Sequence, residues 1–130
     1  MEKIKSIETY AGRPLDEIGS FHLYIGRNVP DRINDGEILR EITTEEINNF
    51  FTTLKKVVKG KTVPLFTGYT RIPCFGFRDG QVENSEQVII FRVPLRDILQ
   101  FCFAYIKEFD QDAVYVEVIN STQFIIGREV

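Results

Sequence analysis

The segment FHLYIGRN, residues 21–28, holds three side chains that can take part in binding or acid–base chemistry: His22, Tyr24 and Arg27. An imidazole titrates near neutral pH, a phenol donates a hydrogen bond, and a guanidinium holds carboxylate or phosphate groups. Apolar residues occupy the alternate positions Phe21, Leu23 and Ile25. This alternation predicts a strand with one buried face, so we expect His22 and Tyr24 to share the opposite, open face.

Two later β-rich segments supply possible partners for this face. In DAVYVEVI, residues 112–119, valines alternate with Tyr115 and Glu117, which predicts that these two side chains lie on the open face. In EQVIIFRV, residues 86–93, we assign Ile89, Phe91 and Val93 to the helix-facing side. That choice places Arg92 on the open face, with Val88 and Ile90. The predicted ligand-binding set is therefore His22, Tyr24, Arg27, Arg92, Tyr115 and Glu117.

A face that is half apolar and half ionisable has two uses. It can be buried against a second copy of the sheet, with Arg92 and Glu117 paired, which is the reading we favour because structural ion pairs outnumber catalytic ones. It can instead form a ligand cleft, in which Arg27 and Arg92 hold an anionic group. The two uses are compatible, since a dimer interface can leave a pocket at its margin.

Three functional hypotheses follow. The first is a non-enzymatic homo-oligomeric binding module, a homodimer or larger, for a small anionic ligand. The second is a cofactor-free small-molecule enzyme, isomerase-like or oxygenase-like, that uses His22, Tyr24 and Glu117. The third is a protein-interaction or inhibitor protein that docks through the open face or through the hairpin at residues 77–84.

The sequence lacks the common signatures of cofactor and metal chemistry. GFRDGQ matches neither phosphate-binding glycine pattern, and GYTRIPCFG has no nucleophile-elbow spacing. One histidine and two cysteines, Cys74 and Cys102 in apolar surroundings, favour free buried thiols over a metal site. We therefore expect no cofactor and no metal.

Length and charge set the broad class. The 130 residues suit a single domain, 1–130, whose first 19 residues are weakly patterned. A net charge of −3 and a pI near 5.2 argue against extended nucleic-acid binding. No apolar run is long enough for a membrane span, and the N-terminus has no signal-peptide pattern, so we expect a cytoplasmic protein with no membrane partner.

Two amphipathic segments predict helices. EITTEEINNFFTTLKKVVKGK, residues 41–61, contains a capping box at Thr43 and Glu46 and places Gly60 at its end. LRDILQFCFAYIKEF, residues 95–109, carries a second apolar stripe. The residues expected to be buried by the helices are Ile47, Phe50, Phe51, Leu54, Ile98, Phe101, Cys102 and Tyr105, with Val58 on the first stripe.

The remaining strands complete a β-α-β-β-α-β order. RDGQ places Asp-Gly between two strand-like runs, a strong hairpin signal. This order predicts an α+β fold of the ferredoxin-like plait type, an antiparallel sheet with both helices on one face and strand order 4-1-3-2. The FHLYIGRN strand is then central, between EQVIIFRV and DAVYVEVI, and KIKSIETY and STQFIIGREV are possible extra strands at the termini.

Several of these segments resemble a family of small bacterial proteins of unknown function. The matching residues are LYIGR at 23–27, Glu83-Asn84-Ser85 ahead of VIIF, and DAVYVEV near the end. The resemblance covers about residues 20–126 and departs at the hairpin, where CFGF replaces an expected tryptophan. It implies a ferredoxin-like α+β fold and carries over no catalytic residue.

Overall fold

The computed structural model describes residues 9–78 and 80–128, which form eleven strands and two helices. The strands are β1 (Thr9–Tyr10), β2 (Arg13–Pro14), β3 (Ile18–Gly26), β4 (Asn28–Pro30), β5 (Ile38–Glu41), β6 (Lys55–Val58), β7 (Lys61–Pro64), β8 (Thr70–Arg78), β9 (Gln81–Pro94), β10 (Ala113–Val118) and β11 (Gln123–Gly127). The helices are α2 (Thr44–Thr53) and α3 (Leu95–Glu108).

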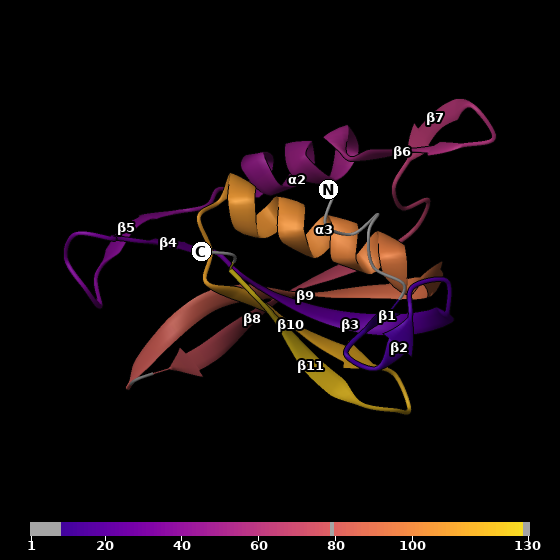
Figure 1. Cartoon of the computed structure of the whole chain (residues 1–130). Helices are drawn as coiled ribbons and strands as arrows, with labels where there is room; N and C mark the ends of the chain where they lie inside the picture. The colour runs from indigo at the N-terminus through magenta and orange to yellow at the C-terminus, as the bar shows by residue number, and fades with distance from the viewer. Residues whose placement is uncertain (1–8, 79, 129–130) are drawn as a thin grey trace.

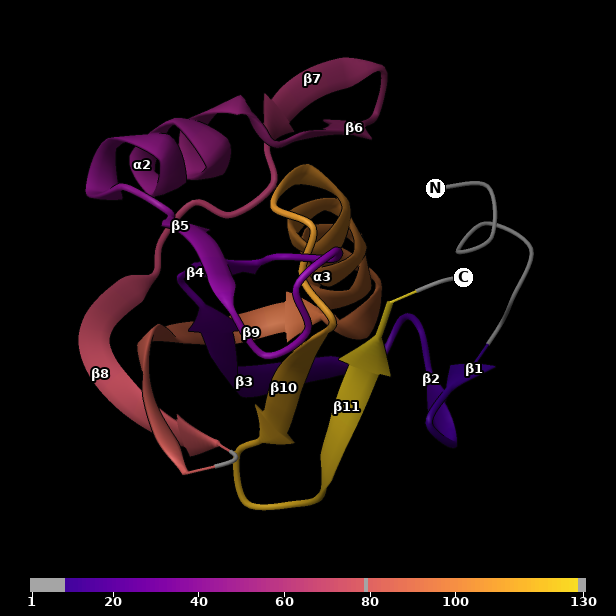
Figure 2. The ribbon, with the colours of Figure 1, turned by 90° about the vertical axis from the view of Figure 1, so that its left-hand side faces the viewer.

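The main sheet is antiparallel and has five strands in the order β11-β10-β3-β9-β8. Strand β3, which contains FHLYIGR, is central between β9 and β10, as its apolar alternation and the neighbouring β-rich segments predicted. Both helices lie over one face of this sheet, and the other face is open (Figure 1). The view from a second side shows the same two layers (Figure 2).

The prediction of a ferredoxin-like plait is wrong. Among the described residues, strands far outnumber helices, and three separate two-stranded sheets, β1–β2, β4–β5 and β6–β7, accompany the five-stranded sheet. Two segments account for the difference. Residues 28–37, NVPDRINDGE, carry turn signals typical of an irregular loop, but residues 28–41 form the β4–β5 hairpin. The end of the first predicted helix forms β6–β7.

Helix α2 begins where the sequence predicted and ends early. The capping box is present: Thr43 Oγ1 accepts from the Glu46 N–H, and the Glu46 carboxylate accepts from the Thr43 N–H. The helix ends at Thr53, and the chain turns through Lys59 and Gly60, both with positive φ, to pair β6 with β7. The run of β-branched residues beyond Thr53 favours strand over helix, so Val58 lies outside the core.

The Glu46 carboxylate has a second role, because it also accepts two hydrogen bonds from the Arg40 guanidinium at 2.8 and 2.9 Å. This arginine, followed by the Thr43 N–H, lowers the pKa of Glu46 to about 2. A carboxyl whose pKa is lowered on folding stabilises the fold above its unfolded pKa and loses that contribution as the pH falls towards 2. The cap therefore persists through mildly acidic conditions.

The core lies between the helices and the sheet. Seven of the eight residues expected under the helices are buried, and Leu54 is partly buried and packs against the same cluster. Aromatic rings dominate: Phe101 contacts Phe50, Phe51, Phe66 and Tyr105 with ring centroids 5.0 to 6.0 Å apart. Such contacts supply much of a small domain's stability.

Two expectations concern the ends of the chain. The extra strand predicted within STQFIIGREV is present as β11, which pairs with β10. Most of KIKSIETY lies outside the described residues, and its last two residues, Thr9 and Tyr10, pair with β2. In the described part of the chain, neither helix is long and apolar enough to cross a membrane.

Replacing Phe51 by alanine is expected to lower the free energy of unfolding by about 3–5 kcal/mol, because the ring is buried and a cavity would remain. Phe75→Ala is the matched control, since 77% of Phe75 is exposed and its loss should cost less than about 0.5 kcal/mol. Urea unfolding of both variants measures the difference. Equal losses would contradict the assignment of the core.

Candidate functional site

The open face of the sheet is organised in rows that run across its strands. The register places one side chain from each strand in the row through Tyr24, in the order Ile125, Tyr115, Tyr24, Gln87 and Ile72. The rings of Tyr24 and Tyr115 meet edge to face with centroids 5.6 Å apart. Gln87 Nε2 donates to the Tyr24 hydroxyl at 3.1 Å, which helps to fix the ring.

The adjacent row carries an acid–base pair formed by His22 and Glu117, whereas the sequence predicted that Glu117 would pair with Arg92. His22 and Glu117 are directly opposite on β3 and β10, and His22 Nδ1 lies 3.0 Å from Glu117 Oε1. Because an ionised carboxylate only accepts hydrogen bonds, this contact places a proton on Nδ1. Gln123 Nε2 donates to the other oxygen of Glu117 at 3.1 Å, and Gln123 Oε1 accepts from the Tyr115 hydroxyl. One polar network thus links the two rows.

The predicted position of Arg92 is wrong. Val88 pairs with Leu23 and Ile90 with Phe21, so both face the core, and Ile89 lies on the open face opposite His22. Arg92 lies within the register shift between β3 and β9, has φ of 57°, and donates its backbone N–H to Ser20 Oγ. It therefore lies away from Tyr24.

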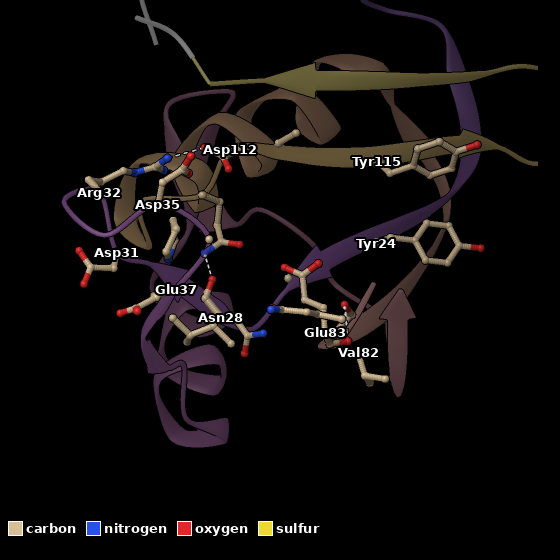
Figure 3. Close-up of a pocket in the computed structure, with 18 of the residues that line it drawn as sticks. Tyr24, Asn28, Asp31, Arg32, Asp35, Glu37, Val82, Glu83, Asp112 and Tyr115 are labelled. Carbon is tan, nitrogen blue, oxygen red and sulfur yellow. Dashed lines mark hydrogen bonds and ion pairs between the residues drawn. The ribbon is translucent and has the colours of Figure 1, made fainter. Parts of the chain in front are cut away.

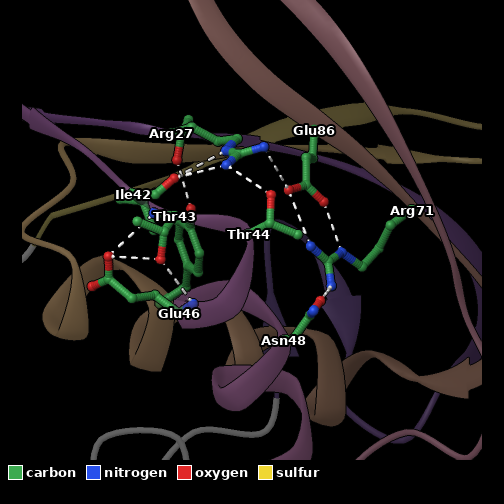
Figure 4. A network of polar contacts seen from close by, with 10 residues as sticks. Arg27, Ile42, Thr43, Thr44, Glu46, Asn48, Arg71 and Glu86 are labelled. Atoms are coloured by element: carbon green, nitrogen blue, oxygen red, sulfur yellow. Dashed lines mark hydrogen bonds and ion pairs between the residues drawn. The ribbon is translucent and has the colours of Figure 1, made fainter.

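Arg27 also points away from the open face. It lies just after β3 on the helix side, where Nη2 donates to the Ile42 carbonyl at 2.8 Å and to Thr44 Oγ1 at 3.2 Å (Figure 4). Its Nη1 is 3.6 Å from the carboxylate of Glu86, a residue that is only 2% exposed. Arg27 thus ties the start of α2 to the sheet.

The Glu86 carboxylate is held mainly by Arg71. Arg71 Nε and Nη2 donate to its two oxygens at 2.7 and 3.1 Å, and Arg71 Nη1 donates to Asn48 on α2 (Figure 4). Two cations satisfy this buried charge, which makes the cluster a structural one. Of the six predicted site residues, the open face therefore brings together His22, Tyr24, Tyr115 and Glu117, and the two arginines that were expected to hold an anion do not converge.

A pocket of about 760 Å³ lies at one end of the open face. Tyr24, Tyr115 and Ile125 contribute from the sheet, the β4–β5 hairpin with its connecting loop forms one wall, and the β9 end of the β8–β9 hairpin contributes another (Figure 3). His22 and Glu117 are not among the lining residues. The acid–base pair is thus a neighbour of the pocket and the tyrosine pair is part of it.

The pocket is acidic. Its lining includes the carboxylates Asp31, Asp35, Glu37, Glu83 and Asp112, against one lining cation, Arg32, among the described residues. Arg32 is already engaged, because its Nη1 lies 2.5 Å from Asp112 Oδ1 and its Nε lies 3.2 Å from Asp110 Oδ2. The same contact lowers the pKa of Asp110. Uncompensated negative charge therefore remains for a ligand.

Gly26, at the end of β3, is one of the residues that line the pocket. A Cβ atom added there would lie 2.8 Å from Gln111 Oε1 and 3.4 Å from Glu83 Oε1. Gln111 is 5% exposed, and its Nε2 donates to the carbonyls of Asn28 and Phe109 at 2.9 and 3.0 Å. The bare backbone of Gly26 leaves room for both oxygens.

These pocket residues were not among those predicted from the sequence. Residues 28–37, NVPDRINDGE, contain three of the carboxylates and Arg32, but a loop with turn signals gives no sign of the surface it will cover. Gln111 follows α3 as one polar residue among several. The one available signal was the density of acidic residues in the loop.

The similarity of this chain to known proteins is a similarity of fold only. No model of a protein family and no curated protein sequence is similar to the chain. The structure is similar to that of a phage SAM lyase in its apo state, with 18% sequence identity, a TM-score of 0.53, and coverage of 96% of this chain and 98% of that chain. The chain thus has a fold found in an enzyme, and the resemblance to the bacterial family of unknown function stays a prediction.

The other reactive groups give no second site. In residues 9–78 and 80–128, no group of three or more His, Cys, Asp or Glu side chains is arranged to hold a metal ion. Cys74 and Cys102 are free thiols, and burial raises the pKa of both, so neither is an activated nucleophile.

Gly26→Ala is expected to displace the Gln111 carboxamide and to lower the free energy of unfolding by about 1–3 kcal/mol, because a buried polar group loses its partners. Gly76→Ala is the matched control on β8, where the nearest atom to an added Cβ lies at an ordinary 3.5 Å. Thermal unfolding measures both. A Gly26→Ala protein as stable as the control would contradict the described packing.

Proposed function

We propose that this chain is a small-molecule enzyme that acts on a sulfonium substrate of the S-adenosylmethionine (SAM) type and cleaves it as a lyase. The observation that carries the proposal is the pocket itself, which combines a pair of tyrosine rings with a wall of carboxylates. The fold shared with a phage SAM lyase supports the same choice. SAM carries an aromatic base, a sulfonium and an ammonium group, and each has a suitable counterpart in this pocket.

The aromatic and acidic parts of the pocket favour a cationic ligand with a flat ring. Tyr24 and Tyr115 can contact a base or a sulfonium, since the negative face of an aromatic ring attracts a cation. The carboxylates attract the same positive charge over a longer range. A volume of about 760 Å³ lies within the range of pockets that bury a nucleoside-sized molecule.

A lyase breaks a bond of its substrate without adding water. In a sulfonium, the bond that breaks joins carbon to the charged sulfur, and the sulfur leaves with the bonding electron pair as a neutral thioether. The carbon takes a new pair either from a neighbouring C–H bond, whose proton passes to a carboxylate that lines the pocket, or from a nucleophilic oxygen within the substrate. The site's contribution is to hold the substrate in the folded geometry that the reaction needs.

The tyrosine hydroxyls already have partners in Gln87 and Gln123. They therefore hold the rings in place, and we assign the tyrosines to substrate binding. The pair formed by His22 and Glu117 lies one row away. We assign it a structural role, because it is connected through Gln123 to Tyr115 and helps to position that ring. The small anionic ligand expected from Arg27 and Arg92 has weaker support, because these arginines lie apart.

Purified protein incubated with SAM is expected to convert it to a thioether, detected by chromatography and mass spectrometry. Tyr24→Leu should lower kcat/KM by about ten- to thirtyfold, because a cation–π contact in a desolvated site contributes up to about 2 kcal/mol. Tyr69→Leu is the matched control, since Tyr69 stacks on Phe51 on the helix side. SAM that stays intact but binds, as measured by calorimetry, would leave a non-enzymatic binding module; SAM that neither binds nor reacts would remove the proposal.

We also propose that the chain forms a homo-oligomer through the open face. Ile125 and Ile72, at the two ends of the Tyr24 row, are 62% and 40% exposed, which leaves apolar area for a second copy to cover. A pocket at the end of this face would remain at the margin of such an interface.

Ile125→Lys is expected to dissociate the oligomer, because it places a charge in an apolar contact. Ile33→Lys, on the β4–β5 loop and off the face, is the control and should keep the wild-type mass. Light scattering coupled to gel filtration gives the mass of each. A wild-type monomer, or an unchanged mass for Ile125→Lys, would count against this interface.

A further inference from the structure

We infer that the pocket contains a subsite for a primary ammonium group, formed by Gln111 Oε1 and the Glu83 carboxylate above the bare backbone of Gly26. This inference rests on the proposed function in identifying the ammonium group as part of a SAM-type substrate. The subsite itself is defined by the geometry of three residues.

The orientation of Gln111 is fixed. Its two Nε2 protons are used by the Asn28 and Phe109 carbonyls, at 2.9 and 3.0 Å, so the carboxamide cannot turn over without losing both bonds. Its Oε1 is left as the acceptor, and no donor to it exists among the described residues. Gln111 is only 5% exposed, and it lines the pocket. None of the buried side-chain oxygens among the described residues lacks a partner, so this oxygen is open to the pocket, where a ligand N–H can donate to it.

Glu83 supplies charge at the same place. Its side chain also lines the pocket, and its Oε1 lies 3.4 Å from the point where a Cβ of Gly26 would be, while Gln111 Oε1 lies 2.8 Å from that point. The two oxygens therefore lie close to the same point beside Gly26, and Figure 3 shows Glu83 among the residues that line the pocket. In the described part of the chain, no cation is paired with this carboxylate.

The chemistry of the two oxygens selects the ligand group. Both are acceptors, and one is charged, so the group that complements them best carries several N–H donors and a positive charge. A primary ammonium group has three donors and one charge, whereas a hydroxyl offers one donor and no charge. The absence of a side chain at Gly26 lets both oxygens lie close to the backbone, so that one group in the pocket can meet them together.

The first experiment tests the subsite without SAM. n-Butylammonium, with n-butanol as the uncharged comparison, is titrated into the protein while the side-chain amide signals of Gln111 are followed by ¹H–¹⁵N NMR. Butylammonium is expected to shift these signals in a saturable way and butanol is not. In Glu83→Gln, binding should weaken about tenfold or more, because a charge-assisted hydrogen bond is lost. Asp35→Asn is the matched control, because it removes another carboxylate that lines the pocket. The change in log Kd for butylammonium in this variant should be less than half of the change in Glu83→Gln.

The second experiment compares SAM with its desamino analogue, in which hydrogen replaces the ammonium group. Wild-type protein is expected to bind SAM about tenfold or more tightly than the analogue by calorimetry, and Glu83→Gln should remove most of this difference. Asp35→Asn should weaken both ligands alike.

The outcomes separate the two proposals. Saturable shifts with butylammonium but no binding of SAM would remove the proposed function and leave the amine subsite. Absence of a butylammonium shift at Gln111 would overturn the subsite, as would equal effects of Glu83→Gln and Asp35→Asn on the two ligands. SAM binding with no preference for the ammonium group would also overturn it and would leave the proposed function standing.

Discussion

The buried carboxylate of Glu86 is the constraint on which the surrounding structure depends. It lies on β9, and Arg71 reaches it from β8 while Arg27 reaches it from the end of β3. The same two arginines continue to α2, through Asn48 and through the Ile42 carbonyl with Thr44. A buried charge that loses a partner costs about 3–5 kcal/mol, so these strands and the helix are held in one arrangement. The cluster thus fixes the position at which β3 ends and the pocket begins.

This arrangement explains why the two faces of the sheet differ. The charges of Arg27 and Glu86 are used on the helix side, where Tyr105 also donates to the Gly26 carbonyl at 2.5 Å. On the open side, the polar side chains form hydrogen bonds with one another. Gln87 bonds to Tyr24, whose ring contacts Tyr115. Tyr115 bonds to Gln123, which bonds to Glu117 and through it connects to His22. Because the rings and the imidazole are already positioned by neighbours, the face presents a fixed aromatic surface at the pocket.

The sequence predicted the parts of this structure that follow from periodicity. The alternation at residues 21–25 placed His22 and Tyr24 on the open face, and the valines of β10 did the same for Tyr115 and Glu117. The prediction from periodicity failed on β9. Residues 88–91 are all apolar there, so the alternation pattern cannot decide on which face Arg92 lies. Arg27 was misplaced because the strand ends at Gly26, where alternation no longer applies. The plait was wrong because turn-rich and lysine-rich segments formed hairpins whose pairing depends on tertiary contacts.

The pocket has a similar origin in chain geometry. A strand that ends at a glycine exposes its backbone at that point. Here two neighbouring segments each place an oxygen over the backbone of Gly26. One oxygen comes from Gln111, just before β10, and the other comes from Glu83 on β9. Any larger residue at position 26 would fill the space that both oxygens occupy. The acidic loop between β4 and β5 then closes the side of this space, held to the body by Arg32 through Asp110 and Asp112. Since Arg32 is used in that contact, the loop adds more negative than positive charge to the pocket, and a cation is the ligand that such a site stabilises.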